Sequence, residues 1–183
     1  NYLADQITVP RFSTELPEFV EAEKAVQARI DHLMGIKGKE SVDSIHKKLG
    51  HIMWEYVGMC RTEEGLKTAL KLLKEIRQEF ETNLFIPGST EGVNIELEKA
   101  LRLNDFITMG ELIAYDALNR NESCGGHFRE EYQTEEGEAK RDDENYFYVS
   151  CWEYQGSDDV APVLYKEPLV YEAIKVQTRN YKS

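Results

Sequence analysis

Apolar residues recur at three- and four-residue steps through the first half of the chain, which is the spacing of one face of an α-helix. The first stripe begins after Pro17, which suits the first turn of a helix, and stops at Gly35 and Gly38, which favour termination. This pattern predicts a first helix after an extended segment at residues 9–12. Its apolar face comprises Phe19, Ala22, Val26, Ile30 and Leu33.

Ser41 precedes an apolar stripe that reaches Cys60, and Thr62 precedes another that reaches Leu84. Serine and threonine are favoured N-cap residues, so each marks the start of a helix. About two residues separate the two helices, and a connection that short predicts antiparallel neighbours. Because Cys60 continues the apolar stripe, we expect it to be an inert thiol in the core.

A fourth helix is predicted from about Asn94 to about Arg120. Its apolar residues cover more than one face, which is typical of a helix buried on several sides. We therefore expect this helix to be the central one.

The character of the sequence changes after Glu122. Glycines and acidic residues run to Asn145, and this stretch is too polar for a core. Aromatic and β-branched residues at 146–154, and a second run at 162–166, then predict two strands joined by a turn at 155–159. Residues 169–175 can supply one more strand. Cys151 lies in the first of these strands, and we expect it to be as inert as Cys60.

The predicted fold class is mainly α: an antiparallel bundle of three or four helices followed by a small C-terminal β-hairpin appendage. We divide the chain into an extended linker at residues 1–16, a helical bundle at residues 17–122, and an acidic loop with a small β-containing segment at residues 123–183. Helical bundles serve many functions, so the fold alone indicates no activity.

The net charge of −12 argues against nucleic acid as a partner, because phosphates require a basic surface. Much of the charge lies at residues 121–159, which hold twelve acidic and three basic residues. We interpret this segment as a solvated acidic surface. No apolar run is long enough to span a membrane. Three cysteines without a Cys-x-x-Cys pair fit a reducing compartment.

The stretch NRNESCGGHFREE, residues 119–131, is the main candidate for chemistry. Cys124 and His127 would have to act as a thiolate nucleophile and its base, yet their spacing matches no local signature of such enzymes. The structural interpretation is stronger. In it, Gly125 and Gly126 end the long helix, and polar neighbours satisfy its unpaired carbonyl groups.

Sequence motifs for metals and nucleotides are absent. His46 and His51 are five residues apart, whereas zinc ligands on one helix face typically lie four apart. No GxGxxG motif follows a strand, and there is no phosphate-binding P-loop motif. From the residues alone we expect no catalytic, cofactor-binding or metal-binding residue in this chain.

Three segments resemble the C-terminal domain of the flavoprotein subunit of succinate dehydrogenase and fumarate reductase. The first is MWEYVGMCRTEEGL at residues 53–66, and the second is Asn104 with ELIA at residues 111–114. The third is NESCGGHFR at residues 121–129 with RDD at residues 141–143. There the family typically has Arg-Glu-Ser-Arg-Gly-Ala-His, an arginine two residues later and a downstream Arg-Asp-Asp. The resemblance covers roughly residues 41–166. Aspartate oxidase shares this architecture, but the acidic insertion and the hairpin fit the respiratory subunit better.

The resemblance implies a parent oxidoreductase that interconverts succinate and fumarate, whether as a reductase or as a dehydrogenase. In it a flavin adenine dinucleotide (FAD), usually covalently held, passes electrons to an iron–sulfur subunit. The flavin-binding domain and the substrate-binding residues would lie upstream, and YLAD at residues 2–5 is similar to the segment where the chain leaves that domain. The implied location is cytoplasmic, on the inner face of the cell membrane through the parent complex.

The implied partners are the upstream flavin-binding domain and the iron–sulfur subunit, with no nucleic acid and no direct membrane span. We expect the isolated chain to bind no FAD, to be inactive on succinate, and to expose an apolar patch where the flavin domain belongs. The motifs also indicate candidate contacts with neighbouring domains or subunits. These are Arg120, Glu122, Ser123, His127, Arg129, Arg141 and Asp142.

Two positions depart from the family pattern: Cys124 replaces an arginine, and Gly126 replaces an alanine. If the family arginine forms an interdomain ion pair, that role passes here to Arg120 or Arg129. Two other functions stay open, an autonomous thiol- or metal-dependent enzyme using Cys124 and His127, and a free-standing helical adaptor. A Cys124 pKa well below the usual value of about 8.5 would favour the enzyme.

Overall fold

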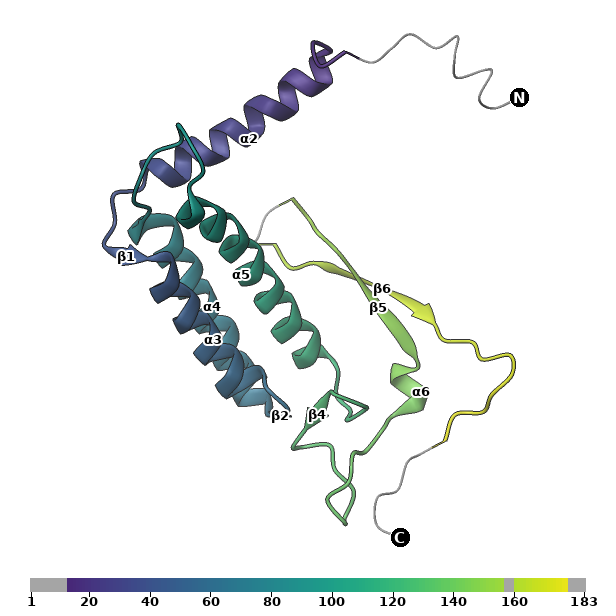
Figure 1. Ribbon diagram of the computed structural model, residues 1–183. Coiled ribbons are helices and arrows are strands. Elements are labelled where there is room, and N and C mark those ends of the chain that lie inside the picture. Colours follow the sequence, from purple (N-terminus) through teal and green to yellow (C-terminus); the bar gives the residue numbers. More distant parts are fainter. Residues whose placement is uncertain (1–12, 157–159, 178–183) are drawn as a thin grey trace, which may run out of the picture.

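A computed structural model describes residues 13–156 and 160–177. Three long helices form its centre, another extends from one end, and a hairpin lies beside the longest helix (Figure 1). The elements in chain order are α2 (Pro17–Gly35), β1 (Glu40–Ser41), α3 (Val42–Val57), β2 (Cys60–Arg61), α4 (Glu63–Asn83), β3 (Leu84–Phe85), α5 (Ile95–Asn119), β4 (Phe128–Arg129), α6 (Asp143–Tyr146), β5 (Tyr148–Glu153) and β6 (Val163–Pro168). The predicted fold class, a mainly helical bundle with a C-terminal hairpin, is confirmed.

The three central helices begin where their sequences predict. The side chains of Ser41, Thr62 and Asn94 each accept a hydrogen bond from the backbone N–H three residues later, at 3.0–3.1 Å. These bonds pair N–H groups that have no partner within the helix. The buried faces then meet in one apolar core, in which Ile45, Leu66, Leu73, Leu103 and Ile107 are almost fully buried.

Two parallel strand pairs join distant parts of the chain. β1 pairs with β3, and β2 pairs with β4 with Cys60 opposite Phe128 and Arg61 opposite Arg129. The second pair connects the loop between α3 and α4 to the segment that follows α5. It therefore positions the polar residues of the candidate site.

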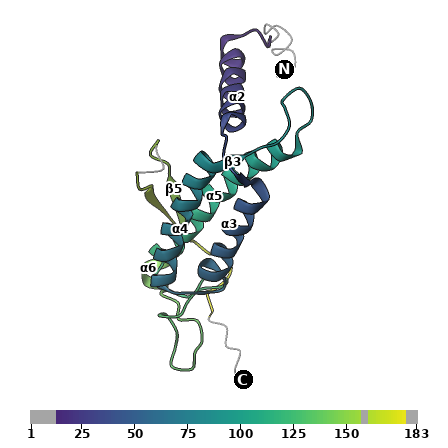
Figure 2. The same ribbon diagram turned by 90° about the vertical axis from the view of Figure 1, so that its left-hand side faces the viewer.

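α2 projects away from the bundle (Figures 1 and 2). Leu33 is its only buried residue, whereas Phe19 and Val26 of the same apolar stripe are 51% and 59% exposed. Arg29 holds the helix to α5 through Asp105, with 3.3 Å between Nη2 and Oδ1. Much of the predicted apolar face of α2 thus has no cover in the described part of the chain.

The hairpin is antiparallel, with Tyr148 opposite Pro168 and Glu153 opposite Val163. Its attachment to the bundle centres on Trp152, whose Nε1 donates to Asp116 Oδ1 of α5 at 2.8 Å. The Trp152 ring also meets the Tyr115 ring edge-on, with 5.0 Å between centroids. α5 accordingly contacts α3 and α4 on one side and the hairpin on another, as a central helix should.

The end of α3 differs from the sequence prediction. The helix stops at Val57, so five residues at 58–62 connect it to α4 instead of about two. A side chain at Gly58 would approach the Trp54 carbonyl oxygen to 2.7 Å, which indicates why glycine occupies this sharp exit. Cys60 therefore lies outside the helix and is exposed, and its predicted place in the core is wrong.

Other expectations for the second half also need correction. Cys151 is exposed because alternate residues of β5 face away from the bundle. The further strand suggested for residues 169–175 is wrong, since the structure describes these residues without a strand. The expectation that residues 123–145 are too polar for a core is also wrong in part, because Ser123 and Arg129 are fully buried.

Several expectations fall on residues outside the described ranges: the family-like segment at 2–5, the extended segment at 9–12, and part of the turn at 155–159. Among the described residues, no helix combines the length and apolarity needed to cross a bilayer.

Candidate functional site

The polar segment after α5 contains a two-residue turn. The Cys124 N–H donates to the His127 carbonyl at 2.8 Å, and the His127 N–H donates back to the Cys124 carbonyl at 3.0 Å. Gly125, at the first central position, has a φ of 59°, in the region that favours glycine. The glycine pair does not end the long helix as predicted, because α5 ends at Asn119 and Arg120 is already extended.

This turn places the His127 imidazole between two partners of fixed hydrogen-bonding character. Its Nδ1 lies 2.8 Å from Arg61 Nη1, and its Nε2 lies 2.9 Å from the Arg120 carbonyl oxygen. A guanidinium can only donate and a carbonyl can only accept. His127 is therefore neutral, with its proton on Nε2.

The electrostatic environment favours the same neutral state. Burial of the imidazole lowers the pKa of His127, and the positive charges of Arg61, Arg129 and Arg120 lower it further. The hydrogen bond to the Arg120 carbonyl opposes this shift. The imidazole thus links the α3–α4 connection to the end of α5 without carrying a charge.

Arg61 holds its side of this link through three bonds. Its Nε donates to the carbonyl oxygens of Val57 at 3.1 Å and Gly58 at 2.9 Å, while Nη1 donates to His127. These carbonyls belong to the end of α3, where groups lack partners within the helix. Burial lowers the pKa of Arg61, although a guanidinium remains charged at physiological pH.

Ser123 and Arg129 form the buried centre of the segment. Ser123 Oγ accepts from the Arg129 N–H at 2.8 Å and donates to the Arg129 carbonyl at 3.1 Å. The Arg129 guanidinium donates to the Ala117 carbonyl at 3.0 Å and pairs with Glu131 at 3.1 Å. Arg129 thereby satisfies a carbonyl at the C-terminal end of α5, as the sequence predicted for a polar neighbour of this helix end.

Arg120 and Glu122 connect the same segment to the hairpin. Their side chains form an ion pair of 2.9 Å, in which Glu122 is buried. Arg120 Nη2 donates to the carbonyls of Tyr146 and Tyr148, and the second oxygen of Glu122 accepts from the Asp142 N–H at 2.9 Å. A buried ion pair with this many additional bonds has its charges well compensated.

Arg141 and Asp142 lie at the edge of this network. Arg141 pairs with Asp143, which raises the pKa of Arg141, and it also donates to the Gln177 carbonyl at 3.2 Å. Asp142 caps the short helix α6 by accepting from the Asn145 N–H. All seven candidate contact residues therefore bond to other residues of this chain, and Asp142 is joined to the His127 cluster through Glu122.

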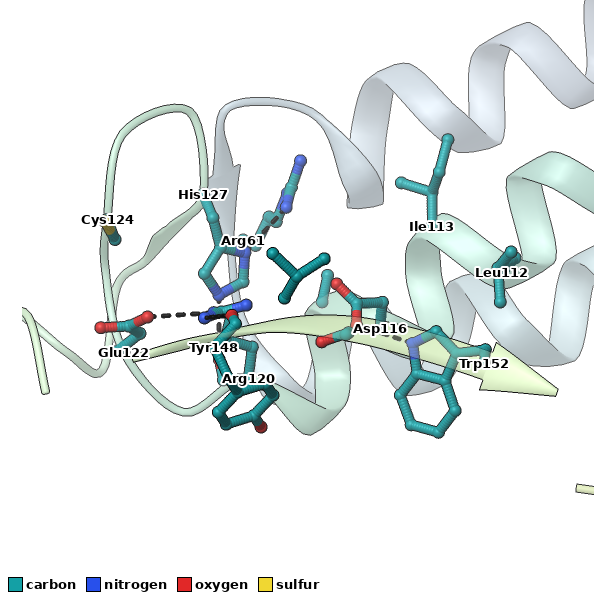
Figure 3. Close-up of a pocket in the computed structure, with 13 residues that line it drawn as sticks. Arg61, Leu112, Ile113, Asp116, Arg120, Glu122, Cys124, His127, Tyr148 and Trp152 are labelled. Atoms are coloured by element: carbon teal, nitrogen blue, oxygen red, sulfur yellow. Dashed lines mark hydrogen bonds and ion pairs between the residues drawn. The ribbon is translucent and has the colours of Figure 1, made fainter. Parts of the chain in front are cut away.

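A pocket of about 590 Å³ opens between the end of α5 and the hairpin (Figure 3). At its polar end, the Arg61–His127 and Arg120–Glu122 pairs line the wall. Leu112, Ile113 and Trp152 lie at its other end, and Val149 also lines it. The cavity is thus a junction between three parts of the fold, and its polar side chains already bond to one another.

This arrangement does not support a nucleophile and base. Both ring nitrogens of His127 are bonded to Arg61 and Arg120, so neither is available to take a proton from Cys124. Cys124 lies exposed on the turn. Within the described ranges, no group of three or more histidine, cysteine or acidic side chains could hold a metal ion.

Arg61 and Asp116 were not among the residues expected at this site. Arg61 lies 66 positions from His127, and Asp116 lies 36 positions from Trp152. Periodicity within one helix carries no information on such pairs. For Arg61 the available signal was its place in the family-like segment MWEYVGMCRTEEGL.

The fold and this network define a helical domain whose motif residues mainly bond to one another. The family model of the C-terminal region of fumarate reductase flavoproteins matches residues 46–181. The chain belongs to this family, as its motifs indicated.

Individual relatives agree with this assignment. The chain is 30% identical to the fumarate reductase flavoprotein subunit of Helicobacter pylori (strain 26695) over 146 residues, which is 80% of this chain and 20% of that protein. It is 37% identical to L-aspartate oxidase 2-b of Nicotiana tabacum over 88 residues, covering 48% of this chain and 13% of that protein.

A solved quinol–fumarate reductase structure with menaquinol molecules shares the fold, with a TM-score of 0.72 and 24% identity over 92% of this chain and 28% of that chain. The chain spans about a fifth of the length of the curated fumarate reductase subunits that it matches.

Proposed function

We propose that this chain serves as the helical scaffold and docking domain of a flavoprotein subunit that interconverts succinate and fumarate. The match of residues 46–181 to the family carries this proposal. The bonded network around His127 supports a structural role, since its side chains hold α3, α5 and the hairpin together.

In the proposed parent, a separate domain would hold FAD, which would supply the redox chemistry between succinate and fumarate. The residues of this chain do not fit FAD. A dinucleotide pyrophosphate is held by a glycine-rich turn at a helix N-terminus after a strand, and this sequence has no such turn. In the pocket between α5 and the hairpin, the charged side chains already bond to other residues of this chain: Arg61 to His127, Arg120 to Glu122 and Asp116 to Trp152.

The proposed partners are the flavin-binding domain of the same polypeptide and an iron–sulfur subunit, on the inner face of the cell membrane. In this proposal Arg120, Glu122, Ser123, His127 and Arg129 shape the surface from within, which leaves Arg141 and Asp142 as the better candidates for direct contacts. We keep the division of the chain at residues 16 and 122 as part of the same proposal.

The test compares the chain alone with the polypeptide encoded by its complete reading frame. We expect the purified chain to lack a flavin absorbance spectrum and succinate oxidation, and the complete polypeptide to show a flavin spectrum. Stoichiometric flavin on the chain alone would contradict the proposal. A reading frame that begins near Asn1 and encodes no flavin-binding domain would instead favour a free-standing adaptor.

A thiol-dependent enzyme is the alternative that residues Cys124 and His127 suggested. Titrating the Cys124 thiol distinguishes the two, because a reactive thiol requires a pKa well below about 8.5. The hydrogen bonds of His127 support the structural role over this alternative.

A further inference from the structure

The outer strand of the hairpin has one edge without a strand partner. Among the described residues, β6 pairs only with β5. β5 lines the pocket beside α5, and its Tyr148 carbonyl accepts a hydrogen bond from Arg120, whereas none of the described residues of β6 lines that pocket. The free edge of β6 therefore faces away from the helices. Such an edge is a template on which another chain can add a strand.

The backbone groups of β6 alternate between β5 and this open edge. Pro168, opposite Tyr148, has no N–H to donate, and the next pair along is joined by a bond from the Leu169 N–H to the Phe147 carbonyl at 3.2 Å. Opposite residues of an antiparallel ladder alternate between bonded and non-bonded pairs. The odd-numbered residues of β6 therefore bond to β5, and the even-numbered residues direct their N–H and C=O groups outward.

Prolines lie at both ends of the open edge. Pro168 is the last residue of β6, and Pro162 directly precedes the strand. The two prolines are six residues apart, and this even spacing places both in the outward-facing set. Between them only Leu164 and Lys166 retain an outward N–H group, since proline has none.

The position of these prolines within the alternation distinguishes them from simple strand terminators. A proline at an odd-numbered position of β6 would remove a hydrogen bond to β5. At positions 162 and 168 it removes only a donor that faces outward, which is the placement that strands tolerate. The hairpin thus keeps its own ladder while its free edge loses donors.

The side chains of β6 otherwise favour strand addition. Val163 and Tyr165 are 42% and 56% exposed, and β-branched and aromatic residues of this kind favour strands. In an antiparallel pair of two β6 strands centred on Tyr165, the two tyrosines would lie directly opposite each other, and cross-strand aromatic pairs are favourable. The edge therefore needs a feature that opposes pairing.

We propose that Pro162 and Pro168 together close the outer edge of the hairpin to strand addition by a second copy of this chain. In the alignment centred on Tyr165, Leu164 lies opposite Lys166 of the second copy, and each such pair exchanges two hydrogen bonds. Pro162 then lies opposite Pro168 of the second copy, where neither residue can donate. With an N–H at both positions, the number of hydrogen bonds between the copies would double. This inference concerns the hairpin alone and does not depend on the proposed function.

Self-association of the chain, measured by sedimentation equilibrium, tests this inference. The double variant Pro162→Thr/Pro168→Thr restores both outward N–H groups with a residue suited to strands. One net hydrogen bond strengthens an association by about two- to tenfold, so the double variant should self-associate at least about tenfold more tightly than the unmodified chain. Pro87→Thr, in the connection between β3 and α5, should stay within about twofold because it restores no donor on the β6 edge.

Amide hydrogen exchange shows whether the contact forms through β6. In the unmodified chain the Leu164 and Lys166 amides should exchange rapidly, and those of Tyr165 and Glu167, which bond to β5, should exchange more slowly. Self-association of the double variant should slow exchange at Leu164 and Lys166 by at least about tenfold.

Three results would contradict the inference. The first is a double variant that associates no more tightly than the unmodified chain, and the second is tighter association without slower exchange at Leu164 and Lys166. The third is slow exchange of these two amides in the unmodified monomer, which would show that the assigned alternation is wrong. If the double variant loses the slow exchange of Tyr165 and Glu167, the single variants Pro162→Thr and Pro168→Thr decide, because each should strengthen association by a smaller factor.

Discussion

At the scale of single residues, the hydrogen bonds of His127 show that the stretch at residues 119–131 has a structural role. Its two ring nitrogens bond to Arg61 and to the Arg120 carbonyl, which fixes a neutral imidazole and removes it from any role as a base for Cys124. The same bonds join residues that are far apart in the sequence. A residue that looks catalytic in the sequence is thus a connector in the fold.

The protonation of His127 should make stability depend on pH. Because the pKa of His127 is lowered in the folded state, the folded protein prefers the neutral imidazole. The contribution of His127 to the free energy of unfolding is therefore fully present above about pH 6.5, where the imidazole is also neutral in the unfolded chain. Stability should fall as the pH drops below that value. His127→Gln retains one acceptor and one donor but does not titrate, so its free energy of unfolding should change less between about pH 7.5 and 5.5. Urea unfolding at several pH values measures this.

The exposed His51 on α3 serves as the matched control for this experiment. His51→Gln should keep the pH dependence of the unmodified chain. An unchanged pH dependence in His127→Gln would show that His127 is not the group responsible. Arg61, Arg120 and Arg129 are the charged groups that act on the imidazole.

The two glycines of the turn should respond in opposite directions to alanine. Gly125 has a positive φ, so Gly125→Ala should destabilise the fold by about 1–2 kcal/mol. Gly126 does not have a positive φ, and a Cβ there would meet nothing within 4 Å. Gly126→Ala should therefore stabilise the fold by about 0.4–1 kcal/mol through the unfolded state. Denaturant unfolding of both variants tests this pair, and equal effects would contradict the assigned turn geometry.

Replacing Ser123 by alanine should destabilise the fold more than the loss of one small hydroxyl group suggests. Ser123→Ala removes the hydroxyl that bonds to both the N–H and the carbonyl of buried Arg129. Leaving buried polar groups without partners should cost about 1–3 kcal/mol. Ser89→Ala, at an exposed serine, should change stability by less than about 0.5 kcal/mol. A loss of equal size at both positions in calorimetry would count against this interpretation.

At the scale of elements, local signals predicted the helices well and their connections poorly. Ser41, Thr62 and Asn94 identified three helix starts because an N-cap bond spans only three residues. The pairing of β2 with β4 could not be predicted, since each strand has two residues and they lie far apart in the sequence. For the same reason, the burial of Arg129 was missed: its partners are set by that pairing and not by its neighbours.

The Trp152 hydrogen bond should be one of the main attachments of the hairpin to α5, beside the bond from Arg120 to the Tyr148 carbonyl. Trp152→Phe keeps an aromatic ring beside Tyr115 but removes the Nε1 donor to Asp116. We expect faster amide hydrogen exchange throughout β5 and β6, with little change in the core of α3–α5. Tyr154→Phe, at a largely exposed tyrosine, should leave exchange in the hairpin unchanged. Equal protection in the unmodified chain and in Trp152→Phe would show that other contacts hold the hairpin.

At the scale of the whole molecule, the structure combines a well-packed centre with elements that lack cover. The core residues of α3, α4 and α5 are almost fully buried, whereas α2 buries only Leu33 and the hairpin is largely exposed. This contrast supports the docking role proposed above.

The contrast should appear as a gradient of local stability in the chain alone. Amide exchange measures the free energy of local opening, which is lowest where few apolar contacts are buried. We expect the N-terminal half of α2 to exchange close to the rate of an unstructured peptide, since a helix without packing is marginal. The central residues of α4 should exchange only through global unfolding. Val26→Ala should leave exchange in α2 nearly unchanged, while Leu33→Ala should release the whole helix, because Leu33 is its buried anchor. Protection of residues near Phe19 equal to that of α4 would mean that α2 is stable without further cover of its apolar stripe.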